Sequence, residues 1–183
     1  MKIIKIFGSE IKEWFLLIIR TLPNAPISNL IRNIFWRKVF NNPSLRIGRM
    51  TVFYNFEVMY FSENVNIGEN CIIDASNSDA GVFFGNNVLI AGSLFIRTAN
   101  HIYKDQNKQI SNQGHFTKKM LLNNVYYSVI IEDNVWISQN VTILSGVKIG
   151  SGAIIGAGCL IIKDVPNNAV MVSNTANILK FRN

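Results

Sequence analysis

The chain has 183 residues, of which 49% are hydrophobic, and its formal net charge at neutral pH is +7. This length predicts one domain with a small appendage, and the hydrophobic share is sufficient for a continuous core. Two cysteines are too few for a disulfide framework, and their number is consistent with a reducing, cytoplasmic setting. No nucleic-acid-binding motif is present, so the positive charge favours an anionic lipid or an anionic cofactor as partner.

Residues 1–42 are predicted to form a basic amphipathic helical region. Apolar residues recur at helical spacing, Pro23 and Pro26 interrupt the pattern, and Ser28 is a candidate helix cap. The apolar run 14–19 is too short to span a bilayer, and it lacks the cleavage site of a signal peptide. Two compatible interpretations remain: the helices pack on the end of the next domain, and their basic face contacts an anionic membrane.

Residues 43–96 carry a six-residue repeat of apolar positions that is interrupted twice. The positions fall in three runs: Ile47 and Phe53, then Phe61, Ile67 and Ile73, then Phe84, Ile90 and Ile96. The steps between runs are not multiples of six, so we expect a small insertion at each, and residues 74–81 have the composition of a loop. Cys71 and, further on, Cys159 occupy the fifth position of a repeat, which predicts two small core residues.

Residues 97–130 drop the repeat and are rich in Asn, Gln and Lys. Loops of this length inside a compact domain are usually functional or disordered. This loop holds both histidines of the chain, His101 and His115. It is therefore the first place to look for acid–base chemistry near neutral pH.

Residues 131–166 form six uninterrupted repeats: IEDNVW, ISQNVT, ILSGVK, IGSGAI, IGAGCL and IIKDVP. The first position is always isoleucine, the fifth is small or β-branched, and the fourth is Asn, Gly or Asp. Such a repeat predicts stacked coils, with corners at the fourth position that have positive φ or a side-chain-supported turn. Pro166 is expected to end the last repeat, and residues 167–183 to pack back on the coil.

The repeat resembles that of the hexapeptide-repeat acyltransferases, particularly the O-acetyltransferases of sugars and surface polysaccharides. The segments ANHIY, QISNQG and VSNTANILK resemble the same family, with Gln109 in place of its usual proline. The resemblance implies an all-β fold, namely a left-handed parallel β-helix over 43–166 with an N-terminal helical segment and an extruded catalytic loop (97–130). It also implies a homotrimer with active sites between subunits. Handedness comes from the resemblance alone, because ordinary crossovers are right-handed.

The activity implied by the resemblance is transfer of an acetyl group from acetyl-CoA to a sugar hydroxyl of a surface polysaccharide or glycolipid precursor. Such a transfer needs a base, oxyanion donors and two aligned substrates. The resemblance implies His101 as the general base, with His115 the lesser candidate. Asp74, Asn77 and Asn100 are the expected substrate-binding residues, although turn chemistry explains Asp74 and Asn77 equally well. No metal is expected.

The cofactor contacts of the family map onto positions in the last repeats and the tail. They are Trp136, Ser138, Gln139, Ala157, Lys163 and Lys180. Ser138 replaces a usual glycine, Ile162 a threonine and Asn177 a basic residue, which weakens the expected phosphate and pantetheine contacts. Trp136 lies outside the core positions, and both a subunit contact and a wall of the cofactor groove remain open for it.

Proteins of the same implied fold have other functions. A β-helical carbonic anhydrase needs three histidine ligands for zinc, and two histidines exclude it. N-acetylation of an amino sugar and a non-catalytic scaffold remain as alternatives. The expected partners are a sugar or glycan acceptor, two further copies of the chain, and an anionic membrane at its cytoplasmic, inner face, but no nucleic acid.

Overall fold

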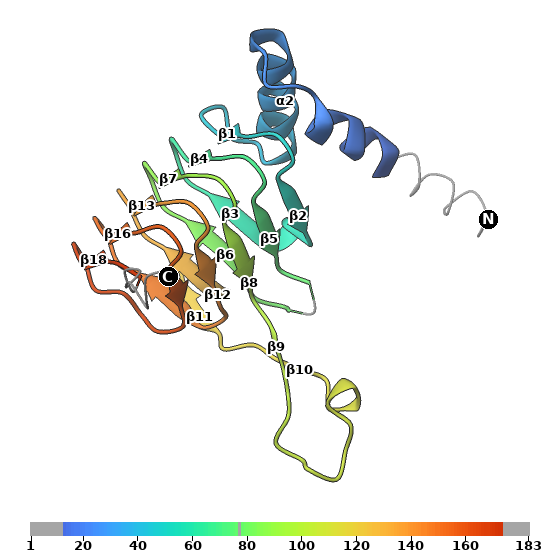
Figure 1. Ribbon diagram of the computed structural model, residues 1–183, viewed down its shortest axis with the longest axis vertical. Coiled ribbons are helices and arrows are strands. Elements are labelled where there is room, and N and C mark those ends of the chain that lie inside the picture. The colour runs from blue at the N-terminus through green and yellow to red at the C-terminus, as the bar shows by residue number, and fades with distance from the viewer. Residues whose placement is uncertain (1–12, 77, 174–183) are drawn as a thin grey trace, which may run out of the picture.

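Within residues 13–76 and 78–173, which the computed structural model describes, the chain winds as a three-sided coil of parallel strands (Figure 1). Sheet A contains β1 (Arg46–Ile47), β4 (Asn66–Ile67), β7 (Leu89–Ile90), β13 (Trp136–Ile137), β16 (Ile154–Ile155) and β18 (Val170–Met171). Sheet B contains β2 (Val52–Tyr54), β5 (Ile72–Asp74), β8 (Phe95–Arg97), β14 (Thr142–Ile143) and β17 (Leu160–Ile161). Sheet C contains β3 (Met59–Phe61), β6 (Gly81–Phe84), β12 (Val125–Ile131) and β15 (Val147–Ile149), with β11 (Met120–Leu122) antiparallel to the start of β12.

The six-residue repeat fills the inside of the coil. The isoleucines at the first position and the small residues at the fifth position of all six repeats are buried. At the fourth position, Asn134, Asn140 and the three glycines have positive φ. Asp164 supports its corner differently, because its Oδ1 accepts a hydrogen bond from the backbone N–H of Lys148 at 2.8 Å. The predicted positive φ is thus confirmed at five of the six corners, and Asp164 instead bonds to the preceding turn of the coil.

The two expected insertions are present at corners of the coil. A short 3-10 helix, η1 (Phe56–Val58), follows β2, and the loop 75–80 follows β5. Cys71 and Cys159 are buried, as predicted for core positions, and burial raises the pKa of the Cys71 thiol.

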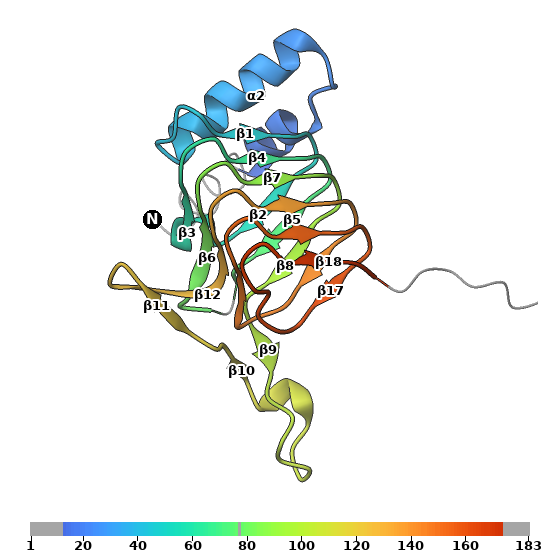
Figure 2. The same cartoon turned by 90° about the vertical axis from the view of Figure 1, so that its left-hand side faces the viewer.

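The N-terminal end of the coil is covered by helix α2 (Pro26–Val39) (Figure 2). The buried Trp36 of α2 packs edge-on against Phe53 of β2, with ring centroids 5.0 Å apart. The prediction of Ser28 as helix cap was wrong, because the helix begins at Pro26 and its N-cap is Ala25. Proline suits the first turn, since its missing N–H has no partner there in any case. No helix of the described residues is long and apolar enough to cross a bilayer.

Two predicted boundaries differ from the structure. The coil continues beyond Pro166, because β18 pairs in parallel with β16 and adds one more strand to sheet A. The loop 97–130 is partly ordered into strands: β9 (Asn100–His101) pairs with β10 (His115–Phe116), and β12 begins at Val125. Between β9 and β10 lies the 3-10 helix η2 (Ile110–Asn112), and this segment projects from the coil away from α2 (Figure 2).

Candidate active site

The root of the projecting loop is fixed to the coil by side chains at the end of β8. Arg97 Nη1 forms an ion pair with Asp74 Oδ2 on the preceding turn at 2.6 Å, and its Nε donates to the carbonyl of Ala99. Asn100 Nδ2 donates to Ser145 Oγ on the following turn at 2.6 Å. The backbone that carries His101 is therefore held from both neighbouring turns of the coil.

His101 and His115 face each other across the first pair of loop strands. They are direct partners in the antiparallel register of β9 and β10, and their ring centroids lie 4.3 Å apart with the planes tilted by 39°. Both side chains are exposed. The structure thus brings the candidate base and the lesser candidate into one place, which the sequence did not indicate.

The tip of the loop is closed by Gln113, the second glutamine of the QISNQG segment. Its Oε1 accepts from the N–H of Asp105 at 3.0 Å, and its Nε2 donates to the carbonyls of Asp105 and Lys108. One side chain thereby satisfies three backbone groups, which is an arrangement that orders a loop without a hydrophobic core. The segment that the sequence analysis singled out by resemblance has a structural role in shaping the loop.

The residues expected to bind the acceptor differ in how accessible their polar groups are to a sugar. Asp74 is buried, and both of its carboxylate oxygens already accept hydrogen bonds from the protein: Oδ1 from the N–H and hydroxyl of Ser76, and Oδ2 from Arg97. Asn100 is exposed. Asn77 lies outside the described residues.

Arg97 and Ser145 were missed by sequence reasoning. Arg97 is one-third exposed beside Asp74, and Ser145 holds Asn100 in place. The sequence did contain one indication of a role for Arg97, because this residue directly follows Ile96, the last apolar repeat position before the loop.

Four of the expected cofactor residues lie at a different corner of the coil from His101. Trp136, Ser138 and Gln139 lie where the chain passes from sheet A to sheet B, and Trp136 is 48% exposed. Ala157 lies beside them on the next turn, because the N–H of Gly158 donates to the carbonyl of Gln139 at 2.9 Å. Lys163 is exposed at the corner between sheets B and C, which is the corner where β8 leads into the loop. Lys180 lies outside the described residues.

Two lysine side chains connect segments at the corner between sheets B and C. Lys119 forms an ion pair with Asp79 of the 75–80 loop at 2.5 Å, and this hydrogen bond is the main cause of the lowered pKa of Asp79. Lys118 Nζ donates to the carbonyl of Gly146 at 3.1 Å. Among the described residues, no group of three or more His, Cys, Asp or Glu side chains could hold a metal ion.

Comparison with known families identifies the coil. Residues 128–163 match the family model described as bacterial transferase hexapeptide (six repeats). The match falls on the stretch of uninterrupted six-residue repeats. No curated protein matches this hexapeptide-repeat chain.

Solved structures match nearly the whole hexapeptide-repeat chain. A maltose O-acetyltransferase from Clostridium difficile 630 is 28% identical with a TM-score of 0.67, covering 92% of this chain and 82% of that one. A hexapeptide-repeat acetyltransferase from Vibrio cholerae is 21% identical with a TM-score of 0.55, covering 96% and 92%. A galactoside acetyltransferase in complex with coenzyme A is 24% identical with a TM-score of 0.57, covering 85% and 72%. The predicted left-handed parallel β-helix is confirmed.

Proposed function

We propose that this protein transfers an acetyl group from acetyl-CoA to a hydroxyl of a sugar acceptor. The observation that carries the proposal is the likeness to the maltose O-acetyltransferase, which extends over 92% of the chain. The galactoside acetyltransferase of the same fold holds coenzyme A, which supports acetyl-CoA as the donor. The acceptor we expect is a sugar of a surface polysaccharide or glycolipid precursor.

The reaction is direct transfer with His101 as general base. Its neutral imidazole removes the proton of the acceptor hydroxyl while the oxygen attacks the thioester carbonyl, and the imidazolium returns the proton to the departing thiolate. An acetyl-cysteine intermediate is disfavoured because Cys71 and Cys159 are both buried in the core. His115, whose ring packs against that of His101, positions the base.

The active unit we propose is a homotrimer. Trp136, Ser138, Gln139 and Ala157 lie at the corner between sheets A and B, whereas His101 follows β8 at the corner between sheets B and C. A second copy could place its sheet A–B corner beside the His101 loop, and closed cyclic symmetry would repeat this contact. The exposed indole of Trp136 fits both a subunit contact and a wall of the cofactor groove.

We propose that helix α2, at the N-terminal end of the coil, contacts an anionic membrane at the cytoplasmic face of that membrane. Large apolar side chains are exposed at helical spacing on the outer side of α2: Ile27, Leu30, Ile31 and Ile34. Lys38 continues this stripe at the end of the helix and is also exposed. An apolar stripe that ends in basic residues suits the boundary between headgroups and acyl chains.

The activity is tested by incubating the protein with acetyl-CoA and a panel of sugars and glycan precursors. Free coenzyme A is followed with a thiol reagent, and the acceptor products are followed by mass. Loss of the added acetyl group in mild base identifies an ester, whereas an amide persists and would favour the N-acetylation alternative. Absence of thiol release above the hydrolysis rate with every acceptor would favour the non-catalytic scaffold.

A further inference from the structure

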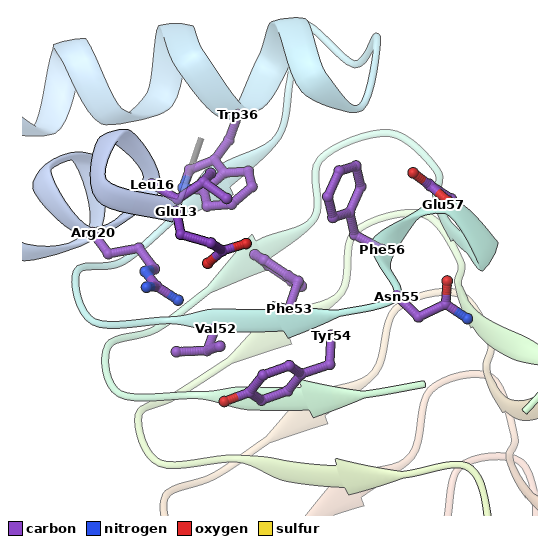
Figure 3. A pocket seen from close by; sticks show the side chains of 10 residues that line it. All are labelled: Glu13, Leu16, Arg20, Trp36, Val52, Phe53, Tyr54, Asn55, Phe56 and Glu57. Carbon is purple, nitrogen blue, oxygen red and sulfur yellow. The ribbon is translucent and has the colours of Figure 1, made fainter. Parts of the chain in front are cut away.

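A cavity of about 260 Å³ lies where the helix over residues 13–21 meets β2 and α2 (Figure 3). Leu16, Trp36 and Phe53 provide apolar walls. The buried indole N–H of Trp36 has no hydrogen-bond partner within the described residues. Buried donors are nearly always satisfied, so this one indicates that an acceptor group belongs beside it.

Polar side chains surround the opening of the same cavity. Glu13 and Arg20 come from the helix, Tyr54 lies across the end of β2, and Glu57 belongs to η1 (Figure 3). Within the part of the chain that the structure describes, the side chains of Glu13, Arg20 and Glu57 make no ion pair or hydrogen bond with one another or with other groups. Apolar walls with a few convergent and uncommitted polar groups are typical of small-molecule sites.

The chemistry of the lining selects the class of ligand. Two carboxylates, Glu13 and Glu57, oppose one guanidinium, Arg20, so an anionic ligand would be repelled. A pyranose ring offers an apolar C–H face for aromatic walls and hydroxyl groups for carboxylate, guanidinium and indole partners. A neutral sugar residue therefore matches both kinds of lining, and a free fatty chain would leave the charged groups without partners.

The cavity lies on the same corner of the coil as the proposed active site. Tyr54, at its mouth, pairs in register with Asp74, and Asp74 pairs with Arg97 at the root of the His101 loop. Neighbouring strands are roughly 4.8 Å apart, so Tyr54 and Arg97 are separated by about 10 Å along the coil axis. A glycan of a few sugar units could reach from His101 to this cavity.

We propose that the cavity is a distal subsite that binds a neutral sugar residue of an extended acceptor glycan. The inference rests on the proposed function and adds to it that the natural acceptor is an oligosaccharide or polysaccharide rather than a single sugar. It assigns Tyr54, Glu13 and Trp36 to binding of a sugar unit that is not itself acetylated.

The test is calorimetry of the full chain without acetyl-CoA, using maltotetraose, chitotetraose and a sialic acid tetramer as probes. We expect at least one neutral tetrasaccharide to bind more tightly than its own monosaccharide, and the anionic tetramer to bind less well. Tyr54→Ala and, separately, Glu13→Gln should each raise the Kd of that tetrasaccharide by roughly tenfold, the effect of one lost contact of about 1.4 kcal/mol. Tyr60→Ala is the matched control, because Tyr60 is equally exposed at 52% but does not line the cavity.

Three results would overturn the inference: no neutral tetrasaccharide binds better than its monosaccharide, both cavity variants bind as the wild type does, or Tyr60→Ala weakens binding as much as they do. His101→Ala separates this inference from the proposed function. If tetrasaccharide binding persists in His101→Ala and depends on Tyr54 while the wild type acetylates no acceptor, the subsite stands and the proposed activity fails. If the wild type acetylates a sugar but binding is independent of the cavity, the activity stands and the subsite fails.

Discussion

The rings of His101 and His115 lie 4.3 Å apart at directly paired positions of β9 and β10, at the start of the projecting loop. Two imidazoles in one place raise the question of which one takes the proton. His101 follows the anchored Asn100, whereas His115 comes after the loop has folded back. We expect the better-anchored ring to be the general base, because catalysis requires a fixed geometry.

Replacement of the two histidines should therefore have unequal effects. His101→Ala should lower kcat by about a hundredfold to ten-thousandfold, the usual contribution of a general base, with little change in acetyl-CoA affinity. His115→Ala should lower kcat much less, since it removes only packing on the base. Steady-state kinetics with the acceptor found by mass measures both values. Near-normal turnover in His101→Ala together with a large loss in His115→Ala would assign the base to His115.

Direct transfer makes a second prediction, about the cysteines. Cys71 is fully buried with a raised thiol pKa, and Cys159 is 4% exposed. Neither should react with iodoacetamide at neutral pH in the folded protein, because the thiolate is the reactive form and access is blocked. Activity should survive this treatment, and both cysteines should be alkylated after unfolding in urea. An acetyl-cysteine trapped by acid quench and found by peptide mass would contradict direct transfer.

The cofactor residues make a third prediction. Lys163→Ala should weaken acetyl-CoA binding and reduce its salt dependence, because an exposed ammonium that contacts phosphate or pantetheine would be lost. Lys180→Ala is expected to act in the same direction. Calorimetry at two salt concentrations measures both effects, and Lys104→Ala, another exposed lysine, serves as control. Unchanged affinity in both variants would place the cofactor elsewhere on the coil.

The regular part of this molecule could be predicted from sequence because its contacts are local. Each isoleucine at the first repeat position is buried inside the coil, and corner residues such as Asn134 and Gly152 have the positive φ that their turns need. A six-residue spacing is enough to predict such contacts. The same spacing predicted that both cysteines are core residues.

The site could not be predicted in the same way because its contacts join segments without a repeat. His101 and His115 meet through an antiparallel hairpin register, and Arg97 meets Asp74 through strand pairing across an insertion. The helix start was misplaced at Ser28 because proline at the first turn competes with a side-chain cap. The end of the coil was placed too early because Pro166 follows the last regular repeat, whereas β18 pairs beyond it.

The exposed stripe of α2 makes a fourth prediction. The double substitution Leu30→Ser and Ile34→Ser should reduce co-sedimentation with vesicles of phosphatidylglycerol and phosphatidylcholine, because it removes apolar area from the contact. Leu121→Ser, at an exposed leucine on β11, is the control. Binding of the wild type should fall with added salt and with the share of anionic lipid. Equal pelleting of all three proteins would mean that the stripe does not contact membrane.

The fifth prediction concerns stability at acid pH and rests on Glu132, which joins two turns of the coil. Its Oε1 lies 2.7 Å from Lys148 Nζ, and its Oε2 accepts from the N–H and hydroxyl of Ser151 at 3.0 and 3.1 Å. Partial burial raises the pKa of the carboxyl, but the hydrogen bonds from Lys148 and Ser151 outweigh it, so the folded pKa lies below the ordinary value of 4.5.

A carboxyl with a depressed pKa in the folded state binds protons more readily when the chain is unfolded. The stabilisation by this carboxylate is therefore complete above about pH 4.5, the pKa of the carboxyl in the unfolded chain. It is lost as the pH falls through the folded pKa. Glu132→Gln should lower the free energy of unfolding by roughly 1 kcal/mol at about pH 7. This difference from the wild type should shrink as the pH falls toward the folded pKa of Glu132. Urea unfolding at fixed protein concentration measures the difference at each pH, since oligomers make stability concentration-dependent. A gap between wild type and variant that is constant or grows toward acid pH would show that the carboxylate charge does not stabilise this pair of turns.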